Sequence, residues 1–404
     1  MNSDDSRSNN GSNNPVCIPN NLNHNLNSNS NCNPPEIDQN ISTTTMLLNI
    51  VNNYHEFYNT EVKYRYQYVT SLYNISNADL VSVELLTEVG ITESDKCYKF
   101  LINSPRFYKL TQIQPTEFVE LYKVLKELID TTPVISYDLD NKSDEIAEIS
   151  VNTRKRKLGS ADRLFVWLLE LDGVNAELLA EIFDCSASTI RNNTKFITDI
   201  ILNELEDEIE WPDEIERKQL RGLFPVSDKA IAVIDGTHCE IKIPFNMEQE
   251  ISYFSGYKHK HTQLYMVVID IYGFFRMIEG PWPGQYNDRS AFIEMDIYKN
   301  SSKYFSDGEV MLADGGFGGD GPILYPFNAV ALNADASEKD SMKSFNQVLT
   351  DSRALVEHAI HRLKSRATAL THRYPKNKDQ QFRTLKAAAI LYNWTRRYRI
   401  KKQI

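Results

Sequence analysis

The stretch KAIAVIDGTHCEIKI, residues 229–243, decides the fold of the C-terminal half of the chain. Its apolar residues follow one another without the three- or four-residue spacing of a helix, and they lead directly into Asp235, Gly236 and Thr237. A short apolar run that passes into turn residues is typical of a buried strand. We therefore predict a strand with Asp235 at or near its end.

Four stretches downstream extend this strand into an α/β domain. In chain order they predict a hairpin of two strands, a Pro/Gly loop that becomes a helix, a buried strand and a final helix. This order predicts one sheet covered by helices. The stretches are HTQLYMVVIDIYGFFRMIEG (261–280), PWPGQYNDRSAFIEMDIY (281–298), EVMLADGGF (309–317) and DSRALVEHAIHRLKSRATAL (351–370).

Three carboxylates occupy related places in this layout. Asp235 and Asp314 lie at predicted strand ends, and Glu357 lies at the edge of the apolar stripe of the last helix. If they converge, each pair of charges about 4 Å apart repels by about 4 kcal/mol at an effective dielectric near 20, so cations must offset them. Oxygen ligands on rigid elements suit Mg²⁺ or Mn²⁺, and two such ions activate a water for attack on a phosphodiester. Taken singly, the same residues also fit a turn and a solvated helix face.

Asp288 lies in the NDRS turn and has two interpretations, an additional metal ligand or the N-cap of the following helix. Basic residues near the carboxylates fit a channel for a polyanion. Arg353 and Glu357 also fit a surface ion pair worth about 0.3 to 0.5 kcal/mol. The basic residues predicted to contact DNA here are Lys258, Lys260, Arg353 and Lys364.

Residues 160–203 predict a helix, a short turn and a second helix. In AELLAEIFDCSASTIRNNTKFITDII (176–201), an apolar face precedes the break at 184–186, and Ser186 is a plausible N-cap. The pattern fits a helix-turn-helix whose second helix reads base edges in the major groove, although any two packed helices give a similar pattern. The predicted apolar face is Leu178, Leu179 and Ile182, and the predicted DNA-facing residues are Ser188, Arg191, Asn192 and Lys195.

The remaining chain is divided by composition. Residues 1–45 contain 14 Asn and 7 Ser, so we predict a disordered tail. Residues 46–130 show helical periodicity, and we predict a helical region of unknown role. A polar linker, 131–158, contains the cluster Arg154-Lys155-Arg156-Lys157, which fits either a nuclear import signal or a solvated linker. The predicted domains that follow are a DNA-binding region, 159–225, and the α/β domain with the three carboxylates and basic C-terminal helices, 226–404.

Net charge at first argues against a nucleic-acid partner, because 44 Lys and Arg face 55 Asp and Glu, a balance of −11. The average hides a split: residues 361–404 carry 13 Lys and Arg against one Asp, which makes this segment +12 and the rest −23. Phosphate attraction acts over roughly 8 Å at physiological salt, so the local charge matters more. No apolar run approaches the roughly 18 residues of a membrane span, and we expect no membrane partner.

Five motifs in this order resemble the PIF/Harbinger transposases and their domesticated derivatives, which are DDE nucleases of the RNase H-like superfamily. The resemblance covers about 160–395 and is most specific over 230–370. The motifs are IDGTH, GYKHKHTQLYMVVID, GPWPGQYNDRSAF, VMLADGGF and FNQVLTDSRALVEHAIHRLKSR.

This resemblance implies an α/β RNase H-like domain, with a mixed sheet flanked by helices, preceded by an all-α helix-turn-helix region. It implies that Asp235, Asp314 and Glu357 are catalytic and hold Mg²⁺ or Mn²⁺. Such sites cut transposon ends and join the freed 3′-hydroxyl to double-stranded target DNA. The resemblance also implies a separate Myb-like DNA-binding partner, and we expect a nuclear protein that forms a homo-oligomer.

Two functions stay open at this point. One is an active transposase, and the other is a domesticated DNA-binding protein that has lost cleavage. A phosphatase of the haloacid dehalogenase type is excluded, because its nucleophilic Asp would stand two positions before Asp235, where the sequence has Val233.

Overall fold

The computed structural model describes residues 80–133, 158–244, 246–306, 308–334, 338–371 and 378–403. The predicted tail at 1–45, the first part of the helical region and the basic cluster at 154–157 lie outside the described residues. Among the described residues, no helix is both long and apolar enough to cross a membrane.

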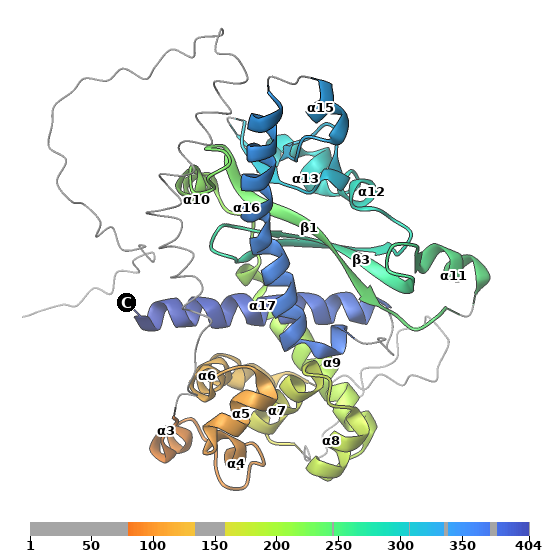
Figure 1. The fold of residues 1–404 in the computed structure, drawn as a ribbon. Coiled ribbons are helices and arrows are strands. Elements are labelled where there is room, and N and C mark those ends of the chain that lie inside the picture. Colours follow the sequence, from red (N-terminus) through yellow and green to blue (C-terminus); the bar gives the residue numbers. More distant parts are fainter. Residues whose placement is uncertain are drawn as a thin grey trace, which may run out of the picture. The chain divides into compact units, whose positions relative to one another are not determined.

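The centre of the C-terminal half is one mixed sheet (Figure 1). Its long strands are antiparallel neighbours, with β3 between β1 and β4, whereas β5 pairs with β1 in parallel. Two short strands that the sequence pattern did not predict, β2 and β6, extend the sheet at its edges. The strands are β1 (Ala230–Glu240), β2 (Phe254–Ser255), β3 (Lys260–Ile269), β4 (Phe275–Pro283), β5 (Val310–Leu312) and β6 (Ile323–Leu324).

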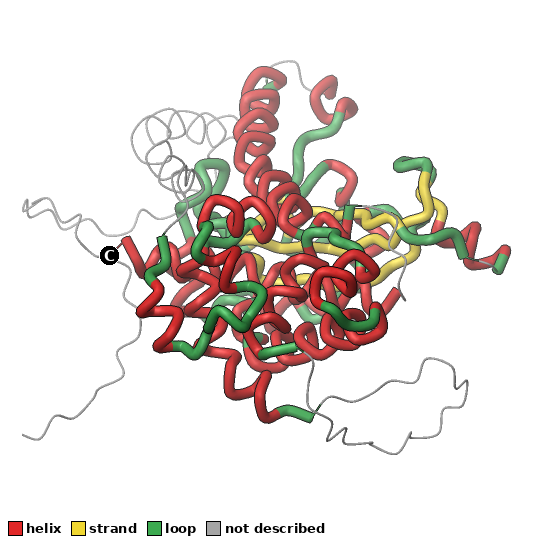
Figure 2. The backbone as a smooth tube through the Cα atoms, turned by 90° about the horizontal axis from the view of Figure 1, so that it is seen from below, coloured by secondary structure: helices red, strands yellow, loops and turns green. Residues whose placement is uncertain are grey.

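Both faces of the sheet are buried, which explains why its strands read as continuous apolar runs. Successive side chains of a strand point to opposite faces. In β1, Val233 belongs to one apolar core while Ile234 belongs to another, and in β3 Val267 and Met266 divide in the same way. Figure 2 shows the strands as one layer with helices around them.

Helices of the C-terminal half are divided between these two faces. The first core is covered by the long helices α16 (Lys339–Arg366) and α17 (Lys378–Gln403), and the second by short helices that include α10 and α12. The shorter elements are α10 (Glu214–Leu220), α11 (Met247–Tyr253), α12 (Asp288–Phe292), α13 (Asp296–Lys299), α14 (Ser301–Tyr304), η3 (Gly315–Phe317), α15 (Ala329–Ala334) and η4 (Thr368–Leu370).

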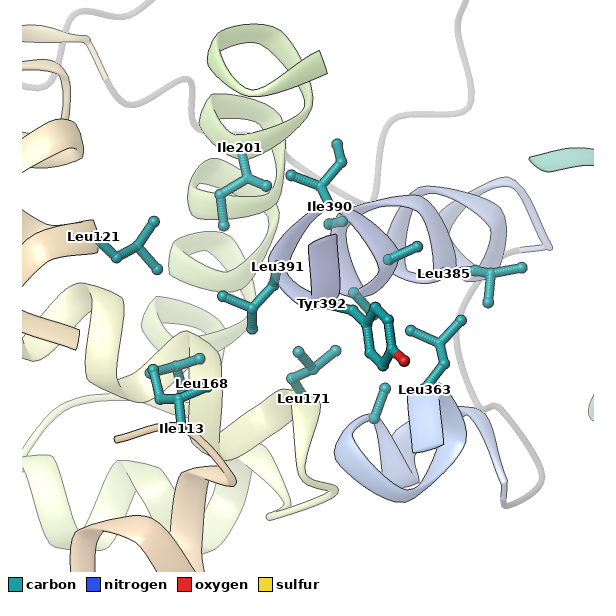
Figure 3. Packing of buried hydrophobic residues seen from close by; sticks show 14 of the residues in the cluster. Ile113, Leu121, Leu168, Leu171, Ile201, Leu363, Leu385, Ile390, Leu391 and Tyr392 are labelled. Atoms are coloured by element: carbon teal, nitrogen blue, oxygen red, sulfur yellow. The ribbon is translucent and has the colours of Figure 1, made fainter. Parts of the chain in front are cut away.

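The described part of the N-terminal half is helical, as predicted. Its elements are α3 (Val83–Glu88), α4 (Tyr98–Leu101), α5 (Ser104–Thr111), α6 (Pro115–Thr131), α7 (Ser160–Leu171), α8 (Ala176–Phe183), α9 (Ala187–Glu204) and η2 (Glu206–Glu208). Apolar residues of these helices and of α17 belong to one core, so Leu121, Leu168 and Ile201 lie in the same cluster as Leu391 (Figure 3).

Helices α8 and α9 are joined at the predicted break. Asp184 has φ +50° and ends α8, and the Ser186 hydroxyl accepts a hydrogen bond from the Thr189 N–H at 3.1 Å, so Ser186 is the N-cap as predicted. The predicted apolar face of α8 was wrong in part, because Leu178 and Ile182 are 53% and 42% exposed. The buried face of α8 consists instead of Ala176, Leu179 and Phe183, which are three and four residues apart.

Candidate active site

Asp235 lies in the middle of β1, not at or near its end as predicted. The antiparallel partner β3 accompanies β1 as far as Glu240, whereas the parallel partner β5 stops at the pair Val233↔Leu312. Asp235 therefore lies two residues beyond the point where one neighbouring strand ends. The strand is longer than its apolar run indicated, because pairing with β3 continues through the polar residues.

Asp314 follows β5 by two residues and precedes the 3₁₀ turn η3. The turn is held by Phe317, which is fully buried with its ring centroid 5.8 Å from that of Phe292. The Asp314 side chain is 51% exposed. Its backbone is thus anchored while its carboxylate remains accessible.

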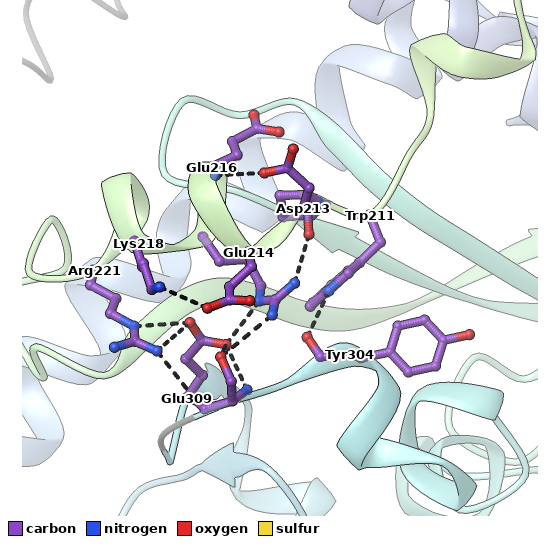
Figure 4. A network of polar contacts seen from close by, with 11 residues as sticks. Trp211, Asp213, Glu214, Glu216, Lys218, Arg221, Tyr304 and Glu309 are labelled. Carbon is purple, nitrogen blue, oxygen red and sulfur yellow. Dashed lines mark hydrogen bonds and ion pairs between the residues drawn. The ribbon is translucent and has the colours of Figure 1, made fainter.

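A buried ion-pair network fixes the other end of β5. Glu309, next to the strand, has a fully buried side chain and accepts hydrogen bonds from Arg217 Nε at 2.9 Å and from Arg221 Nε at 2.9 Å (Figure 4). Burial alone would raise the pKa of Glu309, but hydrogen bonds from the Ser306 N–H and from both arginines hold it below its ordinary value. This network ties β5, and with it Asp314, to helix α10.

Glu357 lies on α16, and its side chain is 60% exposed. Its neighbours Val356 and Ala359 are buried, so Glu357 lies at the edge of the apolar stripe, as predicted. Since α16 covers the same face of β1 that Asp235 points to, the helix brings Glu357 towards the strand carboxylates.

The guanidinium of Arg353 lies among all three carboxylates. Its Nη1 donates a hydrogen bond to Asp314 Oδ1 at 3.1 Å, and its Nη2 lies 3.9 Å from Glu357 Oε1 and 4.0 Å from Asp235 Oδ1. The side chain is only 10% exposed. Arg353 and Glu357 are therefore not the simple surface pair that the helix spacing allowed, because the arginine is buried and shared by three acids.

Asp288 is a fourth carboxylate of this cluster. Its predicted role as an N-cap was wrong, because Asn287 caps α12 by accepting a hydrogen bond from the Ser290 N–H at 2.8 Å. The Asp288 carboxylate instead lies against Gly236, where a Cβ atom would come within 2.0 Å of its Oδ1. Gly236 points to the opposite face of the sheet from Asp235, so its missing side chain lets Asp288 reach the site from the α12 side.

The acids of the cluster influence one another's protonation. Burial raises the pKa of Asp235 to about 6, with Asp288 and Glu357 adding to the rise and Arg353 opposing it. Burial followed by the charge of Asp314 also raises the pKa of Asp288, while Lys258 and Arg353 lower it. Burial is thus the main cause of both raised pKa values, and the neighbouring acids add to it.

The donor set suits a hard divalent cation. It consists of carboxylate oxygens without sulfur or imidazole, which is the preference of Mg²⁺ and Mn²⁺. In the described part of the chain, however, no three acidic, His or Cys side chains converge closely enough to hold one ion as they stand. The carboxylates are spread around the Arg353 guanidinium rather than around a common point. The ligand atoms are thus of the type that these metals prefer, and the Arg353 guanidinium lies among them.

Three of the four predicted DNA-contacting residues near the site have partners within the protein. Lys260 pairs with Glu240 at 2.6 Å, the Lys364 ammonium donates to the His238 carbonyl at 2.7 Å, and Arg353 is engaged as described. Lys258 is exposed, with its ammonium 4.5 Å from the centre of the Tyr257 ring, and its charge acts on Asp288. Lys258 is therefore the best placed of the four to meet a phosphate.

Many basic residues of the segment 361–404 are also engaged internally. Arg383 pairs with Asp199, Arg397 pairs with Glu208 at 3.0 Å, and Arg399 pairs with buried Glu117. The surplus of +12 in the sequence is thus partly offset by acids of the N-terminal helices. Local charge in the sequence overstated the basic surface of this segment, because ion pairs across elements are invisible in a linear count.

The predicted DNA-facing residues of α9 lie on its outer side. Ser188 and Arg191 are exposed, whereas Asn192 and Lys195 are half-buried. Arg191 forms an ion pair with Glu177 of α8. Burial lowers the pKa of Lys195, and Arg383 lowers it further, while Asp199 opposes the shift. Base reading by this helix stays a prediction.

Two features of the site were not predicted from the sequence. The position of Arg353 among three acids could not be seen, although its spacing of four residues from Glu357 was visible. The contact between Gly236 and Asp288 had one signal, a glycine directly after Asp235 inside a strand, since strand glycines often mark close approach of another group.

A comparison with known protein families gives a match over the region that contains this site. A family model described as DDE superfamily endonuclease matches residues 234–393, which include the four carboxylates and Arg353. No curated protein and no solved structure gives a significant match to the chain. The match supports a DDE-type nuclease or transposase, and the mixed sheet flanked by helices fits an RNase H-like DDE domain.

Proposed function

We propose that this protein is a metal-dependent DNA transposase of the PIF/Harbinger type, which cuts transposon ends and transfers the freed 3′-hydroxyl to target DNA. One observation carries the proposal: the carboxylates of Asp235, Asp314 and Glu357 surround the guanidinium of Arg353. The first and last of these acids are 122 residues apart along the chain. The match to DDE endonucleases over the same region supports it.

Asp235, Asp314 and Glu357 would hold Mg²⁺ or Mn²⁺, and Asp288 is the additional ligand candidate. Bound divalent ions supply a Lewis acid for the phosphate and lower the pKa of an attacking water. The strand carboxylates hold fixed positions because β1 and β5 are buried on both faces. Glu357, on the exposed edge of α16, is the ligand with most freedom to adjust.

The reaction balances without a further reagent. In cleavage, a water oxygen bonds to phosphorus and loses a proton to solvent. The bond from phosphorus to the 3′-oxygen breaks, and the 3′-oxygen takes up a proton from solvent to become a hydroxyl. In strand transfer, this 3′-hydroxyl attacks a target phosphodiester, so that one ester replaces another. The chain's own contribution is to align the attacking and leaving oxygens in line.

Double-stranded DNA is the substrate that we propose, with Lys258 near the site and the outer side of α9 as its contacts. The exposure of Lys258 and of Arg191 supports this assignment. A nuclear location, a separate Myb-like partner and a homo-oligomer are proposals that rest on the sequence resemblance and on the cluster at 154–157.

Cleavage of a DNA duplex that contains the transposon ends, with Mg²⁺ or Mn²⁺, tests the proposal. Wild type should cut, while Asp314→Asn and Glu357→Gln should lose at least about 100-fold in rate, because each removes a charge that holds the metal. Asp340→Asn on the same helix α16 is the matched control, since the side chain of Asp340 is 96% exposed.

Two results would contradict the transposase. Equal cutting by wild type and both carboxylate variants would show that the activity does not use this site. Specific DNA binding by the wild type without any cutting under either metal would favour the domesticated, catalytically silent DNA-binding protein instead.

A further inference from the structure

We propose that Arg353 is the resident cation of the metal-free site: its guanidinium holds Asp235, Asp314 and Glu357 together until divalent ions arrive, and gives way when they bind. The inference rests on the proposed function in one respect, that the site takes divalent ions. It adds a role for Arg353 in the state that precedes the reaction.

The position of Arg353 is that of a counter-ion. Its two terminal nitrogens lie 3.1 Å from an oxygen of Asp314, 3.9 Å from one of Glu357 and 4.0 Å from one of Asp235. A single positive charge therefore neutralises part of the charge of three acids. Asp288 adds a fourth negative charge nearby. One guanidinium among four carboxylates leaves a large negative surplus, which divalent ions are suited to neutralise.

Arg353 is also held loosely for a buried arginine. Only the bond to Asp314 has hydrogen-bond length, and its buried Nε has no hydrogen-bond partner among the described residues. Arg217 provides the comparison within the same protein, since its side chain is also 10% exposed. Its Nε, Nη1 and Nη2 are bonded to Glu309, the Pro212 carbonyl and the Ser306 hydroxyl at 2.9, 3.0 and 3.5 Å.

This contrast separates a structural arginine from an exchangeable one. Arg217 uses all three nitrogens, as expected of a group that stays in place. Arg353 leaves its buried Nε donor without a partner, which is unfavourable. Displacement of the Arg353 guanidinium should therefore cost less free energy than displacement of the Arg217 guanidinium. The guanidinium can therefore be displaced from the acids without the loss of a complete hydrogen-bond network.

Exposure gives the direction from which the exchange would occur. The carboxylates of Asp314 and Glu357 are 51% and 60% exposed, whereas Arg353 is 10% exposed. An arriving cation meets the two acids before it meets the guanidinium. A DNA phosphate, in contrast, would have to pass three negative charges to reach Arg353, so a phosphate contact by this residue requires that the acids first be neutralised.

The test measures Mn²⁺ binding and thermal unfolding, with the full chain and without DNA. Arg353→Gln should bind Mn²⁺ about 5- to 10-fold more tightly than wild type in calorimetric titration, because the competing cation is gone. In EDTA the same variant should melt about 2 to 4 °C lower, because the acids repel without a counter-ion, and saturating Mn²⁺ should remove this difference. Lys343→Gln on the same helix α16 is the matched control: its side chain is 57% exposed in an ion pair with Asp340, and neither measurement should change beyond error.

Several outcomes would overturn the inference. Mn²⁺ binding that is unchanged or weaker in Arg353→Gln would mean that the arginine supports the metal site rather than competing for it. An EDTA melting temperature equal to that of wild type would show that Arg353 is no counter-ion, whatever the metal does. If Arg353→Gln does not fold, Arg353→Lys replaces it. The shorter lysine side chain reaches the acids less well and competes less with the metal, so Mn²⁺ binding should again be tighter than in wild type. Weaker binding would again overturn the inference.

Failure of the proposed function is distinguishable from failure of this inference. A protein that binds Mn²⁺ with the expected dependence on Arg353, yet cuts no DNA, would retain the exchange and lose the transposase. A wild type that cuts DNA while Arg353→Gln shows neither effect would retain the transposase and lose the exchange.

Discussion

Gly236 is the residue that admits the fourth carboxylate to the site. Because a Cβ at this position would meet Asp288 Oδ1 at 2.0 Å and Leu264 Cδ1 at 3.2 Å, only glycine leaves room for the observed arrangement. The requirement is one of space, not of backbone conformation. A small residue beside Asp235 thus has a direct consequence for the chemistry of the cluster.

Gly236→Ala should displace the Asp288 carboxylate and lower metal-dependent cleavage by roughly 10- to 100-fold, because small displacements of site groups are costly to catalysis. Overpacking should also lower the free energy of unfolding by about 1 to 3 kcal/mol. Cleavage assays and urea unfolding check both effects. Gly256→Ala, where nothing lies within 4 Å of the added Cβ, is the control. Unaltered cleavage by Gly236→Ala would argue that Asp288 has no part in the site.

His238 should make the stability of the protein depend on pH. Its Nδ1 shares a 2.8 Å hydrogen bond with the Thr262 hydroxyl, and burial, followed by the charges of Lys258 and Lys364, lowers its pKa to about 4. The His238 imidazole is protonated near pH 6.5 in the unfolded chain but only near pH 4 in the folded chain. Stability contributed by neutral His238 is therefore present above pH 6.5 and is lost as pH falls from 6.5 to 4.

The size of this loss is about 2 kcal/mol, after allowance for partial solvent screening. Urea unfolding of wild type and His238→Gln at pH 7.5 and pH 5 measures it, and the variant should lose less stability on acidification than wild type. Exposed His361→Gln should behave as wild type does. A wild type and a His238→Gln variant with the same pH dependence would show that His238 titrates alike in both states.

At the scale of elements, two adjacent residues at the start of α12 have different roles, one structural and one in the carboxylate cluster. Asn287 caps the helix, while Asp288 faces the carboxylate cluster. The short helix therefore contributes to the site only through the residue that follows its cap. Because α12 is packed into the second core by Ala291 and Phe292, the position of Asp288 is defined by that core.

Asn287→Ala and Asp288→Asn should consequently have opposite signatures. Loss of the cap should lower the free energy of unfolding by about 1 kcal/mol, with a smaller effect on cleavage. Asp288→Asn should lower metal-dependent cleavage by about 10-fold or more and leave stability equal or higher, because it removes a desolvated negative charge beside other acids. Unfolding and cleavage measured on both variants decide the matter. The reverse pattern would return Asp288 to a capping role.

At the scale of the whole molecule, α17 connects the mixed sheet to the helices of the N-terminal half. Its residues Ile390 and Leu391 belong to the core that also contains sheet and N-terminal helix residues. Near its end, Arg399 Nη2 lies 3.0 Å from Oε2 of Glu117, whose side chain is 1% exposed. The described helices of α6 to α9 and the sheet should therefore unfold together.

Glu117→Gln should lower the free energy of unfolding by about 3 to 5 kcal/mol, because it leaves a buried guanidinium without its partner. The double variant Glu117→Gln/Arg399→Met should lose less than the sum of the two single variants. Urea unfolding followed by fluorescence and by circular dichroism measures this and shows whether one transition is present. Arg397→Met, which breaks a more exposed pair with Glu208, should cost below about 1 kcal/mol. Two separate transitions in the wild type would contradict the connected core.

The sequence by itself determined four of the six described strands, the main helices and the identity of the candidate acids. The apolar runs, the Ser186 cap and the order of motifs are local signals, and each depends on residues near one another in the chain. Only the tertiary structure decided which groups meet. Asp288 lies against Gly236, Arg353 lies among three acids, and the basic C-terminal segment forms ion pairs with distant helices, because these contacts join residues that periodicity and local charge cannot relate.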